Sequence, residues 1–251
     1  MTTMKFETIL LAGLALATGS LASAAPQTSG TEAAQARQIL DLSGTQGGLI
    51  LHLGCGDGKL TAALHASDSY LVHGLDTDAV NVEKARAHLR SLGLYGSVAV
   101  DRFDGKRLPY IDNLANLIVV SGDGQVSSDE LMRVLAPDGA ALFVNSQFVI
   151  RNSQLKKPRP AEIDEWTHYL HDSSNNAVSK DTQVDMPAHL QWLGSPPWSR
   201  HHDHMASTSA MVSSGGRNFY IFDEGPTGSI LLPPQWVLTA RSAFNGVVLW
   251  K

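Results

Sequence analysis

The sequence predicts an α/β protein with a doubly wound parallel sheet, followed by an incomplete all-β region. In the first part of the chain, short apolar runs of buried-strand type alternate with helical segments, as they do in parallel sheets. In the last third, helical periodicity disappears and short β-type runs are separated by turn residues. The 251 residues thus divide into two unlike parts, although their average of 43% hydrophobic and 17% charged residues is ordinary for a globular protein.

Charge and cysteine content exclude two classes of protein. The formal net charge is -5 and the sequence pI is near 6.0, so a strongly basic nucleic-acid binder is not expected. The single cysteine, Cys55, has no second cysteine with which to close an intrachain disulfide, so the chain is no disulfide scaffold.

The N-terminal residues 1–24 have the order of a secretory signal peptide. Lys5 precedes an apolar run from Ile9 to Ala17, and the small residues Ala22-Ser23-Ala24 stand where cleavage is expected. The run is too short to cross a membrane, which takes about 20 residues. We therefore expect an exported product, periplasmic or secreted, without a membrane span; the alternative is a buried N-terminal helix.

A glycine-rich turn follows the first predicted strand. After a helix expected over Thr31–Leu42, the apolar run Leu49–Leu53 leads directly into Gly54-Cys55-Gly56-Asp57-Gly58, and a helical stretch with Leu60, Ala63 and Leu64 begins behind it. Glycines let the backbone turn sharply and approach a ligand closely, and the free amides of the following helix favour an anionic group. This junction is the first candidate binding element.

An acidic residue ends the second predicted strand. The run Tyr70–Leu75 is followed by Asp76 and Thr77, about 20 residues after the glycine turn, the separation at which an acid contacts ribose hydroxyls in nucleotide-binding units. Asp78 then caps a helix that ends near Gly93. Three further strands are expected, over Val98–Val100, Leu117–Val120 and Ala140–Val144, the last after a turn at Pro137-Asp138-Gly139.

These motifs, together with Asp104-Gly105 and Leu135–Gly139, resemble the successive motifs of class I S-adenosylmethionine-dependent methyltransferases over residues 31–146. The resemblance implies a Rossmann-like fold and S-adenosylmethionine as a small-molecule cofactor. It implies that Gly54, Gly56 and Gly58 face the methionine part, Asp76 the ribose hydroxyls and Asp104 the adenine amino group. The candidate cofactor-binding residues are Gly54, Cys55, Gly56, Asp57, Gly58, Asp76, Thr77, Asp104 and Gly105.

Several alternatives stay open for this domain. NAD binding fits less well, because Lys59 stands where the dinucleotide pattern requires a third glycine. A domain that binds nothing is favoured by Asn116, which replaces an acid usual in the family, by the absence of an acceptor motif after Val120, and by the lack of an evident hairpin after Val144. Methyl transfer depends mainly on alignment, so no catalytic residue is assigned. Export away from the cytosolic cofactor favours a non-catalytic scaffold.

Residues 147–187 are expected to form a linker with one short helix. The linker proper is Arg151–Pro160, which is polar and basic. A helix over Glu162–His171 would place Glu165, His168 and Asp172 near one face. They could be metal ligands, but a polar surface of the helix is the favoured interpretation. His201, His202 and His204 pose the same choice between metal site and polar loop, because alternate residues of a strand point to opposite faces; no metal ligand is assigned.

Residues 188–251 resemble the first blade of a quinoprotein-like β-propeller. Strand-like runs over 218–224, 236–240 and 243–251 are separated by turn residues, and Ala240, Gly246 and Trp250 match the propeller repeat, whereas Ser242 and Asn245 depart from it. One blade cannot bury its own faces, so we expect a truncated product whose partners are the missing blades. So short a region could not hold pyrroloquinoline quinone, and a quinone-dependent oxidoreductase would be the activity of a longer protein.

Overall fold

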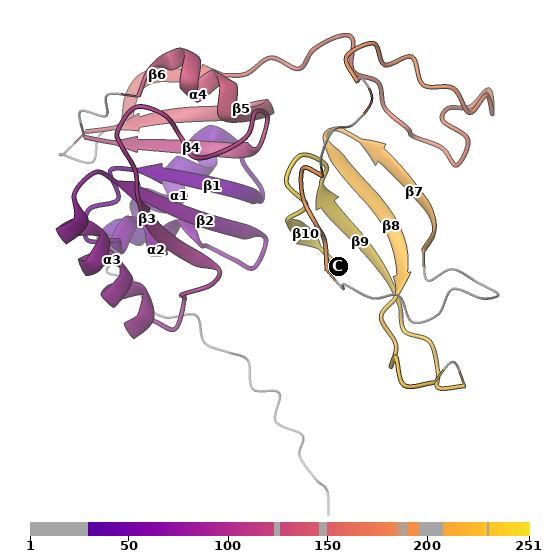
Figure 1. Ribbon diagram of the computed structural model, residues 1–251, viewed down its shortest axis with the longest axis horizontal. Coiled ribbons are helices and arrows are strands. Elements are labelled where there is room, and N and C mark those ends of the chain that lie inside the picture. Colours follow the sequence, from indigo (N-terminus) through magenta and orange to yellow (C-terminus); the bar gives the residue numbers. More distant parts are fainter. Residues whose placement is uncertain are drawn as a thin grey trace, which may run out of the picture.

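The computed structural model describes residues 30–122, 126–145, 150–184, 186, 190–195, 208–229 and 231–251. The expected signal peptide and the three histidines 201, 202 and 204 lie outside these residues. Figure 1 shows an α/β domain beside a separate antiparallel sheet, with the segment after β6 passing between them. In the described part of the chain, no helix is both long and apolar enough to cross a membrane.

The α/β domain contains four helices and six strands among the described residues. They are α1 (Gly30–Ser43), β1 (Gly48–Leu53), α2 (Lys59–Leu64), β2 (Tyr70–Asp76), α3 (Ala79–Ser91), β3 (Val98–Arg102), β4 (Ala115–Ser121), α4 (Ser128–Val134), β5 (Leu135–Val144) and β6 (Ile150–Lys156). The sheet order is β3-β2-β1-β4-β5-β6, and every pairing is parallel except that of β5 with β6. Its order changes direction at β1 and β4, where ligands bind in such sheets.

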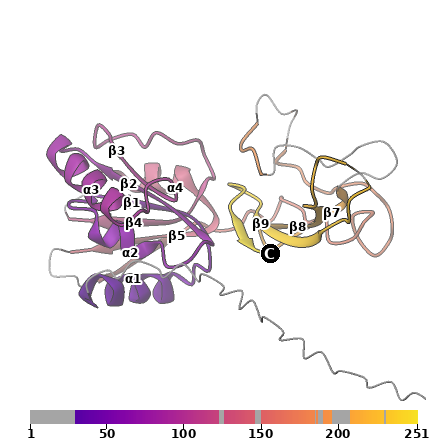
Figure 2. The same cartoon turned by 90° about the horizontal axis from the view of Figure 1, so that it is seen from below.

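Apolar side chains cover both faces of the sheet, which confirms the predicted α/β class. One core cluster joins α1, α2 and α3 to the sheet through residues such as Ile39, Leu64 and Leu89, and the other joins α4 through Leu131 and Val134. Figure 2 shows α1 and α4 on opposite sides of the strands. Each residue of β1 is buried, as expected for a central parallel strand with both faces covered.

Two predictions about the end of this domain are wrong. Strand β6 covers most of the expected linker. It pairs antiparallel with β5, so an antiparallel strand pair follows Val144 although the sequence showed no evident hairpin there. Strand β5 also begins at Leu135 and runs through the expected turn at 137–139, with Asp138 at a φ of 66°. Prolines at 158 and 160 lie beyond β6, so they do not interrupt its ladder.

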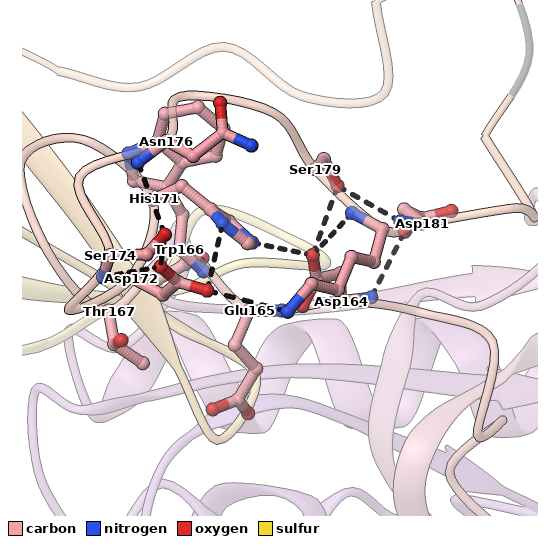
Figure 3. Close-up of polar contacts among 12 residues, drawn as sticks. Asp164, Glu165, Trp166, Thr167, His171, Asp172, Ser174, Asn176, Ser179 and Asp181 are labelled. Atoms are coloured by element: carbon pink, nitrogen blue, oxygen red, sulfur yellow. Dashed lines mark hydrogen bonds and ion pairs between the residues drawn. The ribbon is translucent and has the colours of Figure 1, made fainter.

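The predicted helix over Glu162–His171 is also wrong, because these residues form turns and one antiparallel bridge between His168 and His171. Figure 3 shows the reason, since polar side chains bind nearby backbone groups that a helix would use for itself. Asp164 Oδ2 accepts hydrogen bonds from the Lys180 amide at 2.7 Å and from His171 Nε2 at 2.7 Å. The side chain of His171 is buried and its φ is 72°, so this network fixes an unusual backbone conformation.

The last part of the chain forms one antiparallel sheet. Its strands are β7 (Thr208–Ser214), β8 (Arg217–Asp223), β9 (Trp236–Ser242) and β10 (Val248–Trp250), in the order β10-β9-β8-β7. The strands from β8 onward were expected, whereas β7 was not. A propeller blade also has four strands, but the described residues contain one such sheet, so the propeller stays a prediction.

The antiparallel sheet is fastened to the amino ends of the parallel strands. Asn245 Nδ2 donates to the carbonyl oxygen of Leu114 at 2.8 Å and to Asn116 Oδ1 at 2.7 Å. Ser69 Oγ, just before β2, donates to the carbonyl oxygen of Leu249 at 2.6 Å. The opposite, carboxyl end of the parallel strands carries the glycine turn.

Candidate functional site

The glycine turn has a backbone that only glycine adopts easily. Gly54, Gly56 and Gly58 have φ angles of 74°, 55° and 81°. The turn is closed by a hydrogen bond from the Gly58 amide to the Cys55 carbonyl at 2.9 Å, and the Gly54 amide donates to the carbonyl of Leu75 on β2 at 2.8 Å. The turn is therefore fixed to the carboxyl ends of strands β1 and β2.

The three glycines differ in what surrounds them. A Cβ on Gly54 would lie 2.6 Å from the Ser121 carbonyl oxygen, and one on Gly58 would lie 2.8 Å from Ala85 Cβ. A Cβ on Gly56 would meet nothing within 4 Å. The outer two glycines are thus required by packing, whereas the middle one borders open space that a ligand can enter.

Asp76 lies directly beside this open position. Its carboxylate is nearly buried, with the residue 6% exposed, and Oδ2 accepts a hydrogen bond from the Gly56 amide at 2.9 Å. Oδ1 accepts one from the Asp78 amide at 2.9 Å, and Asn81 Nδ2 lies 3.4 Å from each oxygen. An ionised carboxylate has about four acceptor positions, and the two amides with the two long contacts to Asn81 occupy them, so a ribose hydroxyl would take the place of Asn81 Nδ2.

Asp57 and Cys55 of the same turn face different surroundings. Asp57 is exposed and pairs with Lys59 Nζ at 2.7 Å. Cys55 is buried, and burial together with the negative charge of Asp76 raises the pKa of its thiol to about 12. A thiol with that pKa is protonated at neutral pH and is a poor nucleophile, so Cys55 is a packing residue of the turn.

Thr77 and the Asp104-Gly105 pair meet at the neighbouring strand ends. A Cβ on Gly105, which has a φ of 81°, would lie 3.0 Å from Thr77 Cγ2. Asp104 is exposed, and its Oδ1 accepts hydrogen bonds from the amides of Lys106 at 2.8 Å and Arg107 at 3.0 Å. These backbone donors lower the pKa of Asp104. The predicted residues after β1, β2 and β3 therefore lie at one edge of the sheet.

Sequence reasoning missed His52, which supports this edge from below. Its Nδ1 lies 2.8 Å from Thr61 Oγ1 on α2, and its Nε2 lies 2.8 Å from Ser121 Oγ at the end of β4. Burial lowers the pKa of His52 to about 4, against the opposing effect of Asp76. The ring is therefore neutral at pH 7 and ties three elements together under the glycine turn. A histidine inside an otherwise apolar strand was the available signal.

Glu165, His168 and Asp172 do not form a metal site. Glu165 Oε1 pairs with Arg159 at 2.8 Å and accepts a hydrogen bond from the Gly215 amide at 2.7 Å, whereas Asp172 lies in the His171 network. Among the residues that the structure describes, no group of three or more His, Cys, Asp or Glu side chains is arranged to hold a metal ion.

Residues 50–139 match the family model described as "Methyltransferase domain". The match covers part of the α/β domain and less than half of the chain. The matched range begins in β1 and ends in β5, so it includes the glycine turn, Asp76 and Asp104.

A curated relative that matches part of this chain is Methyltransferase GfsG of Streptomyces halstedii. It is 34% identical over 112 residues, which are 42% of this chain and 39% of the relative. The chain thus spans well under half the length of the curated relative that it matches.

Solved structures similar to the domain include mmp1179 of Methanococcus maripaludis, with a TM-score of 0.43 and 22% identity over 47% of this chain and 57% of that one. Another is geranyl diphosphate C-methyltransferase of Streptomyces coelicolor A3(2), crystallised with S-adenosyl-L-homocysteine, with a TM-score of 0.41 and 19% identity over 45% of this chain and 46% of that one.

Proposed function

We propose that the chain binds S-adenosylmethionine at the carboxyl ends of β1, β2 and β3 and transfers its methyl group to an acceptor. The observation that carries the proposal is the open space at Gly56 beside the Asp76 carboxylate. A Cβ there would occupy the space that the methionine part needs, and a neighbouring carboxylate is a suitable acceptor for ribose hydroxyl groups.

Each predicted residue has a defined task in this proposal. The turn Gly54–Gly58 borders the methionine part, with Cys55 packed beneath it and Asp57 at its rim. Asp76 accepts hydrogen bonds from the ribose, and Thr77 and Gly105 line the gap between the second and third strand ends. Asp104 accepts from the adenine amino group, because its second carboxylate oxygen receives no hydrogen bond from the described residues.

The chemistry rests on alignment of the two reactants. S-adenosylmethionine supplies an electrophilic methyl group on a sulfonium centre, and an acceptor atom placed in line needs little further assistance. In agreement with this, no residue of the turn is an activated nucleophile, and both His52 and Cys55 are uncharged at pH 7. The residues of this chain therefore bind and orient, and the acceptor is unassigned.

Calorimetric titration of the full chain with S-adenosylmethionine and S-adenosylhomocysteine tests the binding step. Asp76→Asn keeps an acceptor for the Gly56 amide but removes the negative charge, and we expect it to weaken binding about tenfold, as for one charged hydrogen bond. Asp41→Ala on the exposed side of α1 is the matched control. Absence of heat at millimolar ligand, or equal affinity in the Asp76 variant, would refute the proposal.

A non-catalytic role as the interaction domain of a propeller protein is the second candidate. It is favoured by the apolar side chains that the antiparallel sheet exposes, among them Ile221, Leu238, Trp236 and Trp250, which are about half exposed. Under this proposal further blades cover that sheet, and any quinone-dependent oxidation belongs to the longer protein. Transfer of a labelled methyl group to any component of a cell extract would contradict it.

We also propose that the chain is exported, on the basis of the signal-like order of residues 1–24. Mass spectrometry of the protein from fractionated cells tests this directly. A mature chain that begins at Ala25 in the extracytoplasmic fraction is the expected result, and an intact N-terminus in the cytosol would refute it.

A further inference from the structure

A cavity of about 360 Å³ lies between the α/β domain and the antiparallel sheet. Its wall combines the loop after α1, the start of β5, the end of β6, the turn between β7 and β8, and the end of β9 with the segment that leads into β10. The cavity is at the amino ends of the parallel strands, whereas the proposed cofactor site is at their carboxyl ends. Its volume is sufficient for a small organic molecule.

Direct hydrogen bonds hold the cavity in shape. Asn116 forms part of the wall and accepts at Oδ1 from both Asn245 Nδ2 at 2.7 Å and the Leu49 amide at 3.0 Å. Leu249, also in the wall, accepts a hydrogen bond from Ser69 Oγ at 2.6 Å. The two domains therefore meet through specific contacts beside the cavity, and a ligand there would touch both of them.

Ser242 supplies an unpaired polar group in this wall. The residue is 2% exposed, and its hydroxyl has no hydrogen-bond partner among the described residues. A buried hydroxyl without a partner lowers stability, and each such group in a folded protein calls for an explanation. A polar ligand in the cavity would provide one if the Ser242 side chain turns its hydroxyl, which is buried in this structure, toward the cavity.

The charges around the cavity favour an anion. Lys156 and Arg217 are exposed in its wall and form no ion pair with the described residues. The wall also contains one acid, Asp138, and that carboxylate is partly neutralised by Arg159 Nη1 at 3.6 Å. Two cations that form no ion pair with the described residues, near a single acid that is partly neutralised, form a site for a carboxylate or phosphate group.

Glycines expose backbone polar groups in the rest of the wall, which a ligand can approach closely. Gly44, Gly47, Gly139, Gly215 and Gly216 all border the cavity, so backbone amides and carbonyls replace side chains over much of its surface. The aromatic rings of Phe244 and Trp250 provide apolar surface in the same wall. A ligand with an anionic group and a polar carbon skeleton matches this lining.

We propose that the cavity between the two domains binds a small organic anion, held by Lys156 and Arg217, with Ser242 as a further hydrogen-bond donor. The carboxylate and phosphate classes share the recognition chemistry. This site is separate from the proposed cofactor site, so it stands even if the chain does not bind S-adenosylmethionine.

Isothermal titration calorimetry of the full chain tests the proposal with three probes. Glucose 6-phosphate and citrate represent the two anion classes, and glucose is the uncharged control. We expect heat with at least one anion and none with glucose. Absence of heat with both anions at millimolar concentration, or equal binding of glucose, would overturn the proposal.

Two variants separate ligand binding from folding. The double variant Lys156→Gln with Arg217→Gln should weaken anion binding about a hundredfold, because each charged contact contributes about tenfold. Arg37→Gln on the exposed side of α1 is the matched control. Ser242→Ala removes a hydroxyl without a partner, so its melting temperature without ligand should be equal or higher while its anion affinity falls. Unchanged affinity in the double variant would overturn the proposal.

Discussion

Replacement of Gly56 by alanine separates ligand access from folding. Gly56 has a φ of 55° and faces open space, so an added methyl group meets no protein atom within 4 Å. The cost to folding is then only that of a left-handed backbone, about 1–2 kcal/mol for an alanine. For a domain of roughly 150–250 residues, 1 kcal/mol lowers the melting temperature by about 2–4 °C, so the variant should stay folded at 25 °C.

The cost to cofactor binding should be larger than the cost to folding. The new methyl group would occupy the space that the proposal assigns to the methionine part, and a close approach of backbone and ligand tolerates no side chain there. We expect at least a tenfold loss of S-adenosylmethionine affinity, which corresponds to about 1.4 kcal/mol. Calorimetry gives the affinity, and thermal unfolding without ligand gives the stability of the same preparation.

Gly93 provides a control with the same backbone. Its φ is 68° and a Cβ there meets nothing within 4 Å, but it lies at the end of α3, away from the glycine turn. Gly93→Ala should lose similar stability and retain full affinity. In contrast, Gly54→Ala forces a contact with the Ser121 carbonyl and should destabilise the fold more than either. Wild-type affinity in Gly56→Ala would show that no ligand approaches this position.

Three further perturbations test the supporting network. Asn245→Ala removes two hydrogen bonds to the α/β domain and should lower the stability of the interface by about 1–2 kcal/mol. Urea unfolding should show this loss, and limited proteolysis should cut faster between the domains. Unchanged unfolding and cleavage rates would contradict the prediction. Because burial lowers the pKa of His52 from 6.5 to about 4, the unfolded chain binds this proton first, so stability should fall as pH drops from about 6.5 to about 4. His52→Gln should remove that slope, and a slope retained in the variant refutes the assignment. Backbone donors and His171 lower the pKa of Asp164, so its contribution is fully present above the ordinary pKa and is lost gradually in acid. Asp164→Asn should therefore lose protection of residues 157–184 from proteolysis at pH 7, and its difference from the wild type should shrink as the pH falls below the ordinary pKa; a difference that does not change with pH contradicts this.

Most elements of the α/β domain were predictable because they carry a local signal, whereas α4 and β6 were not predicted. The run Leu49–Leu53 and the three glycines at 54, 56 and 58 define strand and turn without reference to the rest of the chain. The alternation of strands and helices predicts that both faces of β1 are buried. It also predicts that the nine candidate site residues lie at one edge of the sheet. The hydrogen bond from the Gly56 amide to Asp76 was not predicted, because the spacing of the two motifs indicates only that they lie at the same edge of the sheet.

The errors arose where distant contacts decide the local structure. Strand β6 has a polar sequence and becomes a strand because it pairs with the edge of β5. Residues 162–171 carry a helical pattern, but the hydrogen bond between buried His171 and partly exposed Asp164 stabilises turns instead. His52 was missed for a similar reason, since its partners come from α2 and β4, and no spacing rule connects them.

The carboxamide of Asn116 makes three positions of the chain depend on one another. Its Oδ1 accepts from the Leu49 amide and from Asn245, and a Cβ on Gly48 would lie 1.9 Å from that same oxygen. A larger residue at 48 therefore requires a different residue at 116, which in turn leaves Asn245 Nδ2 with the Leu114 carbonyl but without its second acceptor. In homologues that keep the antiparallel sheet, these three positions should coevolve as a set, and Asp should be the best tolerated replacement at 116 because its carboxylate keeps the acceptor oxygen.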